Sequence, residues 1–185
     1  SLEFISDLTS LVVLDLGCCK LLQGPMKPIA AMLHLETLNL TFCDGLSGQI
    51  DVLGNLTRLS SLDLHGCAGI RGSLQPLSSH AALRRVDLSG LVHLTGDLRP
   101  LSQLTNLAAL HLQGCRLLSG GLEPLAALEK LETLNMMRCT DIAGGVPGVV
   151  IKLLSRRSAN LLYCKGPFSI APGLSLIHIS EPTRH

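Results

Sequence analysis

The stretch LSGQIDVLGNLTRLSSLDL, from Leu46 to Leu64, decides the architecture of this 185-residue chain. Its leucines at 59, 62 and 64 are matched by apolar residues 24 positions earlier and 24 positions later, and the glycine of its LSG element recurs with the same period. Self-similarity at a fixed period of roughly 20 to 50 residues marks a chain built from stacked, similar units. The stretch therefore predicts a repeat architecture in place of a single closed core.

Six copies of the unit LxxLxLxxCxxLxGxLxPLxxLxx follow one another without insertion. Each copy begins with a leucine, and these are Leu11, Leu35, Leu59, Leu83, Leu107 and Leu131. The LxG element places a glycine in each copy, at Gly24, Gly48, Gly72, Gly96, Gly120 and Gly144. One position between the first leucine and this glycine is cysteine in five of the six copies. This column reads Cys19, Cys43, Cys67, Leu91, Cys115 and Cys139.

This unit resembles the leucine-rich repeat family, and its length and LxG element are most similar to the plant-type subclass. The resemblance covers Leu2 to about Val150. In the family the cysteine column usually holds asparagine, and the proline typical of the plant type stands one residue later here, at Pro28, Pro76, Pro100 and Pro124. The resemblance implies an α/β fold, a horseshoe-shaped solenoid with a parallel concave sheet and short helical or irregular convex segments.

Side-chain alternation supports the same architecture. In a strand over 13–16, Leu14 and Leu16 face the core while Asp15 faces outward. So short a strand cannot bury its apolar face alone, and it stacks on its neighbours about 4.8 Å away. The glycine of LxG predicts a tight bend. Proline in the PLxxL segment predicts a short helical turn, because an N–H in a first turn needs no helical partner.

Three outward columns cross the predicted sheet and form a candidate binding face. Neighbours in a column lie one strand apart, so polar residues gather where the middle copies meet. The candidate partner-binding residues are Asp63, His65, Arg85, Asp87, His111 and Gln113. Apolar anchors at Val13, Phe42 and Met137 would complete an interface with a protein or peptide. The alternative is a face that is merely solvated.

The seven cysteines raise the possibility of a metal site or of disulfides. Five of them recur at one inward position, no CxxC pair exists, and the adjacent Cys18 and Cys19 are poorly placed to chelate. We therefore expect no metal and a structural ladder of thiols that bond the backbone of the next coil, as asparagine does in the family. Free buried thiols favour a cytoplasmic location, whereas glycans on the sequons at Asn39 and Asn55 would require secretion.

Several functional classes are disfavoured. The net charge is +1 and no run of Lys or Arg exceeds two residues, which argues against a nucleic-acid partner. No segment approaches the ~20 apolar residues of a membrane span. Asp87, His111 and Ser89 lie on an open sheet without a pocket, so we expect no catalytic residues and no enzyme. The glycines are periodic coil corners and not a phosphate loop, so no cofactor is expected.

The two ends of the chain depart from the pattern. Ser1 falls inside a repeat, which predicts a fragment whose earlier coils are missing. After Val150, polar residues occupy the positions of the next leucines, so residues 151–174 are interpreted as an irregular segment, either a cap, a frameshift or an unspliced intron. Residues 175–185, SLIHISEPTRH, match the translation of a transposon-end sequencing adapter.

Two functional interpretations remain. The first is a non-enzymatic protein-protein interaction module that binds a polypeptide on its concave face, within either an intracellular scaffold or a receptor ectodomain. The second is the targeting or ectodomain part of a larger enzyme, such as a receptor kinase or a ubiquitin ligase. Both draw on fold-level analogy, because nothing in these residues names a ligand.

Overall fold

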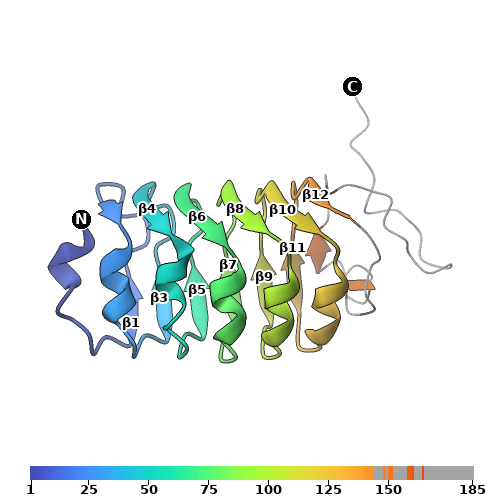
Figure 1. Cartoon of the computed structure of the whole chain (residues 1–185), viewed down its shortest axis with the longest axis horizontal. Coiled ribbons are helices and arrows are strands. Elements are labelled where there is room, and N and C mark those ends of the chain that lie inside the picture. The colour runs from blue at the N-terminus through green and yellow to red at the C-terminus, as the bar shows by residue number, and fades with distance from the viewer. Residues whose placement is uncertain (144–147, 149, 152–157, 161–163, 165–185) are drawn as a thin grey trace, which may run out of the picture.

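The computed structural model describes residues 1–143, 148, 150, 151, 158–160 and 164. Their backbone winds into a stack of coils that follow one another in chain order from one end of the molecule to the other (Figure 1). A typical coil contributes one strand to a first sheet, one strand to a second sheet and one short 3-10 helix. In Figure 1 the helices lie side by side along the near face, with the first sheet behind them.

The first sheet is parallel and is formed by the LxL elements, as predicted. Over the described residues it contains seven strands in the order β1, β3, β5, β7, β9, β11 and β13. Their bounds are β1 (Val13–Asp15), β3 (Thr37–Asn39), β5 (Ser61–Asp63), β7 (Arg85–Asp87), β9 (Ala109–His111), β11 (Thr133–Asn135) and β13 (Ala159–Asn160). Equivalent residues pair across neighbouring strands, as Leu38 does with Leu62 and Leu62 with Val86. The predicted solenoid with a parallel sheet is confirmed.

A second parallel sheet runs along the LxG elements, where the sequence predicts only a bend. Its strands are β2 (Gln23–Pro25), β4 (Gly45–Gln49), β6 (Gly69–Ser73), β8 (His93–Gly96), β10 (Leu117–Gly120) and β12 (Asp141–Ile142). Neighbouring backbones approach closely here, and a Cβ on Gly69 would lie 2.3 Å from the Leu46 carbonyl oxygen. The glycine of LxG still makes the bend at the end of the element, since Gly72 has a φ of +122°.

The PLxxL segments form 3-10 helices, in agreement with the predicted short helical turns. These are η1 (Leu2–Ile5), η2 (Lys27–Ala31), η3 (Ile50–Leu53), η4 (Gln75–Ser79), η5 (Arg99–Gln103) and η6 (Glu123–Ala127). Proline occupies one of the first two positions in η2, η4, η5 and η6. No helix within the described ranges is long and apolar enough to cross a bilayer.

The core is a column of leucines that fills the space between the sheets and the helices. Leu62, Val86 and Leu110 are at most 1% exposed, whereas Asp63, which directly follows Leu62 on its strand, is partly exposed. One core column carries a histidine and reads Met32, Leu56, His80, Leu104 and Leu128. The His80 ring is fully buried; its Nε2 lies 3.0 Å from the Leu53 carbonyl oxygen, and its Nδ1 has no hydrogen-bond partner among the described residues.

The predicted cysteine ladder is present at Cys43, Cys67, Cys115 and Cys139, whereas Cys19, which was expected to face inward with them, is exposed. Each ladder thiol donates to a backbone carbonyl of the preceding coil, from Cys43 to Leu16 at 3.1 Å, Cys67 to Leu40 at 2.9 Å, Cys115 to Leu88 at 3.2 Å and Cys139 to Leu112 at 3.0 Å. Leu91 fills the same position in the fourth coil without a donor. The ladder thus links coils through a column of small, buriable side chains.

Among the described residues past 150, a short strand and a thiol contact the preceding coil. β13 pairs in parallel with β11, placing Ala159 beside Leu134 and Asn160 beside Asn135. The Cys164 thiol reaches back 28 residues to the Met136 carbonyl at 3.1 Å, where the earlier ladder thiols reach back 27. The structure describes only a few residues of 151–174, so the interpretation of that range as an irregular segment stays a prediction. The proposed adapter at 175–185 lies outside the described residues.

Candidate partner-binding face

The three outward columns lie on the open face of the first sheet, in the register that the repeat predicts. Asp63 lies beside Asp87, and Asp87 lies beside His111, on successive strands. Arg85 precedes Asp87 on β7 and is exposed, while Asp63, Asp87 and His111 are each partly buried. Polar side chains from three strands are thus held at one place by a backbone that the leucine core fixes from behind.

One outward column, here called the aspartate column, also ends the strands of the first sheet. It reads Asp15, Asn39, Asp63, Asp87, His111 and Asn135. The Asp63 carboxylate accepts the His65 N–H at 3.0 Å, and the Asp87 carboxylate accepts the Ser89 N–H at 2.8 Å. Asn39 and Asn135 accept the N–H groups two residues later in the same way. This is the usual turn made by Asp and Asn side chains. One carboxylate oxygen of each aspartate is therefore committed to the fold, and the other is left to interact with neighbours.

Asp87 is the centre of a small charged cluster. Its Oδ2 lies 3.3 Å from His111 Nδ1 and 3.9 Å from His65 Nδ1. Burial would raise the pKa of Asp87, but hydrogen bonds from His111 and Ser89 outweigh it and lower the pKa below its ordinary value. The Asp87 carboxylate in turn raises the pKa of the His111 imidazole, against the effect of its partial burial.

The six predicted residues divide between two hollows. Asp63, Arg85, Asp87 and His111 line the first, which has a volume of about 150 Å³ and is floored by the strands themselves. The other two, His65 and Gln113, line a second hollow of about 210 Å³ at the ends of the strands. The prediction put these two on the same face as the others; the structure keeps His65 within 3.9 Å of Asp87 and also places both residues along the second hollow.

The second hollow also contains residues that the sequence analysis did not select. Val92, Arg116 and Arg138 line it, and Phe42 packs on His65 with ring centroids 4.7 Å apart. Phe42 was expected as an apolar anchor, and it is 44% exposed. The missed signals are two further columns that the consensus leaves blank. The column three residues after the aspartates holds Arg138, and the column five residues after them holds Val92 and Arg116.

The arrangement does not form a hydrolytic triad. The Ser89 side chain bonds to the Asp87 carboxylate itself, whereas a nucleophilic serine needs the histidine as its base. Ser89 is 4% exposed, so a substrate cannot reach it. Among the residues that the structure describes, no three His, Cys, Asp or Glu side chains are grouped to hold a metal ion.

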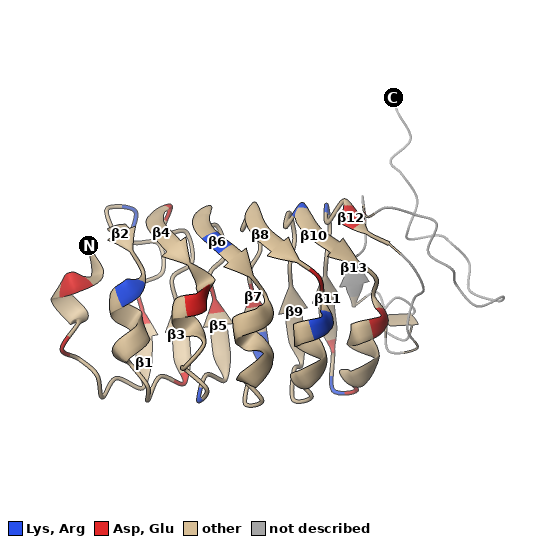
Figure 2. Cartoon of the chain, viewed as in Figure 1, with Lys and Arg blue, Asp and Glu red and all other residues tan. Residues whose placement is uncertain are grey.

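Charge is dispersed over the described coils. Figure 2 shows Lys and Arg positions interspersed with Asp and Glu positions along the stack, without a block of one sign. The net charge of +1 agrees with this distribution. The described coils therefore carry no long-range field of one sign.

The fold matches solved structures of leucine-rich-repeat proteins. The plant peptide hormone receptor RGFR1 in complex with RGF2 has a TM-score of 0.64 and 24% identity, over 85% of this chain and 30% of that chain. A TDR receptor has a TM-score of 0.63 and 25% identity, over 84% and 26%. The functional domain of InlJ from Listeria monocytogenes, which includes a cysteine ladder, has a TM-score of 0.56 and 19% identity, over 76% and 28%.

The chain spans less than a third of the length of each of these three proteins. No protein-family model matches the sequence, and no curated protein does either. The assignment therefore depends on the coil geometry, the register of the two sheets and the column of thiols between them. On these grounds the chain is a leucine-rich-repeat solenoid with a cysteine ladder.

Proposed function

We propose that this chain is a protein-interaction module whose first sheet binds an extended polypeptide. The observation that carries the proposal is the hollow formed by Asp63, Arg85, Asp87 and His111, which presents charged side chains on a rigid open sheet. Two aspartates and an exposed arginine within one hollow offer both acceptors and donors to a passing peptide backbone or side chain. The leucine core behind them holds this geometry without help from a ligand.

The matching structures support the proposal at the level of class. The RGFR1 structure is that of a peptide hormone receptor in complex with RGF2, and the HAESA structure contains the peptide hormone IDA and the co-receptor SERK1. Such solenoids use repeated outward columns to contact a chain that crosses several strands. Binding a peptide would not require any covalent bond to be made or broken at the site, which agrees with a non-enzymatic role.

The test is selection of peptides from a displayed random library on the immobilised protein. Bound peptides are then measured against two charge reversals, Arg85→Glu in the first hollow and Arg71→Glu in β6 of the second sheet. Both arginines are exposed, so neither change should disturb folding. The proposal predicts that Arg85→Glu lowers affinity about tenfold or more, and Arg71→Glu leaves it unchanged. Equal affinity for both variants would place binding elsewhere and refute the proposal.

A further inference from the structure

A column of three glycines passes the second hollow, and two of them, Gly90 and Gly114, line it. The residue three positions after the aspartate column has a positive φ in every described coil, at Cys18, Phe42, Gly66, Gly90, Gly114 and Arg138. Cysteine, phenylalanine and arginine occupy it in three coils, so this backbone conformation does not by itself exclude a side chain. The three successive glycines therefore remove three neighbouring side chains from one place on the surface.

The space above the glycines is open at two of them. A Cβ on Gly114 would find nothing nearer than 3.9 Å, and a Cβ on Gly90 would find nothing nearer than 3.4 Å. At Gly66 a Cβ would lie 2.6 Å from the Phe42 ring, so that glycine makes room for Phe42. The column thus has an aromatic side chain at one end, Arg138 at the other, and an unfilled trough between them.

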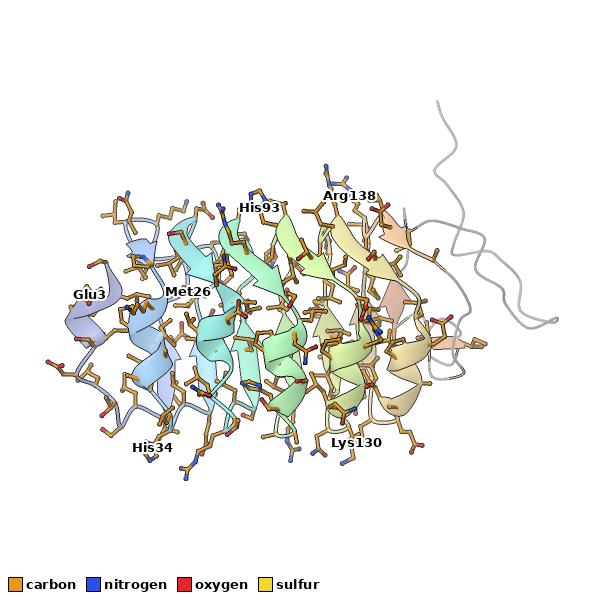
Figure 3. All side chains as sticks on the ribbon, viewed as in Figure 1. Glu3, Met26, His34, His93, Lys130 and Arg138 are labelled. Carbon is orange, nitrogen blue, oxygen red and sulfur yellow. The ribbon has the colours of Figure 1, made fainter. Side chains whose placement is uncertain are left out.

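The floor of the trough cannot recognise a ligand through its own amides. The Gly90 N–H donates to the Gln113 carbonyl at 2.7 Å, and the Gly114 N–H donates to the Met137 carbonyl at 2.8 Å. Recognition is left to the side chains of the walls, and the charged ones there are Arg116 and Arg138. Figure 3 places Arg138 at the same edge of the solenoid as His93, opposite the edge that carries His34 and Lys130.

The two hollows differ in charge. Asp63 and Asp87 accompany Arg85 and His111 in the first, whereas the residues lining the second include two arginines and no carboxylate. A guanidinium group pairs best with a carboxylate, which it can bind through two parallel N–H donors. Val92, 39% exposed, lines the same hollow as the arginines and supplies apolar surface there.

We propose that the glycine-floored hollow receives an acidic side chain of the polypeptide bound by the first sheet, with its carboxylate paired to Arg116. This inference rests on the proposed function, because it concerns a second contact made by the same partner. The partner is then an extended peptide with an aspartate or glutamate at the point where it passes the ends of β7 and β9. The absence of side chains at Gly90 and Gly114 lets the peptide backbone approach closely enough for that contact.

The experiment uses the same peptide library on the full chain and compares four variants. Arg116→Glu and Arg116→Gln change the wall of the glycine-floored hollow, Arg85→Glu reports on the first sheet, and Arg71→Glu serves as the charge-matched control. Arg116 is exposed, so its variants should fold, and circular dichroism checks this. Each selected acidic peptide is also made with its acidic residue replaced by the matching amide.

We expect acidic residues to be enriched at one position of the selected peptides. Arg116→Glu should then weaken these peptides about tenfold or more, and the amide peptides should bind the wild-type protein about as weakly. Raising the salt concentration should reduce this difference. Peptides that depend on Arg85 but show no acidic preference and no loss with Arg116→Glu would overturn this inference and leave the proposed function standing. A library that yields no binder to the wild-type protein would overturn both.

Discussion

Replacing His80 by leucine should stabilise the solenoid. His80 occupies a column that is leucine or methionine in the other described coils, and its ring is fully buried. Its Nδ1 lacks a hydrogen-bond partner in the described part of the chain. A buried polar atom without a partner costs about 1–3 kcal/mol. Leucine removes that atom and restores the side chain that this layer carries in three other coils, at Leu56, Leu104 and Leu128.

The substitution also removes one hydrogen bond, and this sets the net magnitude. His80 Nε2 lies 3.0 Å from the Leu53 carbonyl oxygen, and such a bond contributes about 1 kcal/mol. The Leu53 oxygen keeps a partner in the variant, because it also accepts the Leu56 N–H at 2.8 Å. No new unpaired carbonyl is created. The difference between these two terms leads us to expect that His80→Leu raises the free energy of unfolding by up to about 2 kcal/mol at neutral pH.

The gain should increase in acid. Burial lowers the pKa of His80 below its ordinary value, so the unfolded chain takes up a proton before the folded chain does. The wild-type protein therefore has its full stability above a pH of about 6.5 and loses up to about 1.4 kcal/mol per pH unit below it, until the folded-state pKa is reached. The variant has no such group at residue 80, so the difference between the two proteins widens as the pH falls.

The assay is denaturant unfolding followed by circular dichroism at about pH 7.5 and about pH 5.5. Comparison of wild type with His80→Leu cancels the titration of the other groups. His34→Leu is the matched control, because His34 is exposed at the edge of the stack (Figure 3) and should alter neither stability nor its pH dependence. A His80→Leu protein less stable than wild type, or an equal loss of stability in acid for both proteins, would refute the reasoning.

Three other outcomes are expected. Leu62→Asp should abolish the cooperative thermal transition by burying a charge in the leucine layer, whereas Asp63→Ala should change stability by only about 1 kcal/mol. A larger loss of stability for Asp63→Ala than for Leu62→Asp would contradict the assignment of inward and outward faces. Burial raises the pKa of the Cys67 thiol to about 12, so a chromogenic disulfide reagent at about pH 8 should modify Cys67 only after unfolding. With the exposed Cys18 and Cys19 replaced by serine, rapid reaction of Cys67 in the folded protein would be inconsistent with the ladder. Asp87→Asn should lower the pKa of His111 toward its ordinary value in an NMR titration, because Asp87 raises it, and an unchanged titration would refute the pairing. The contact between Asp87 and His111 stabilises the fold below the unfolded-state pKa of histidine, and this stabilisation is lost as the pH rises through the folded-state pKa.

The leucine spacing predicts most of the architecture, because a period held without slip leaves one way to stack the coils. It predicts the first sheet, the helical turns and the inward thiols, which are present except that Cys19 is exposed. The second sheet was missed because it depends on a close backbone approach at glycines such as Gly69, and a letter pattern does not show that distance. Past residue 150, β13 and Cys164 lie one residue out of the 24-residue frame, so a fixed period does not select them.

The candidate face was predicted less completely than the fold. Columns of outward residues show which side chains share a strand position, and Asp63, Arg85, Asp87 and His111 are indeed gathered in one hollow. Columns do not show where the chain bends after each strand. That bend carries Gln113 away from the cluster toward Arg116, and it puts His65 at the edge of both groups, 3.9 Å from Asp87.

The direction of the ladder has an evolutionary consequence. Each thiol belongs to its own coil and bonds a carbonyl of the coil before it, so a coil carries the donor that attaches it and an acceptor for its successor. In-frame duplication or loss of a 24-residue unit would leave every remaining bond with a partner. Loss of residues 83–106, for example, would remove Leu91 and bring the Cys115 thiol to the carbonyl of Leu64 in place of Leu88. A gene encoding such a chain can lengthen or shorten its product one coil at a time while every ladder bond keeps a partner.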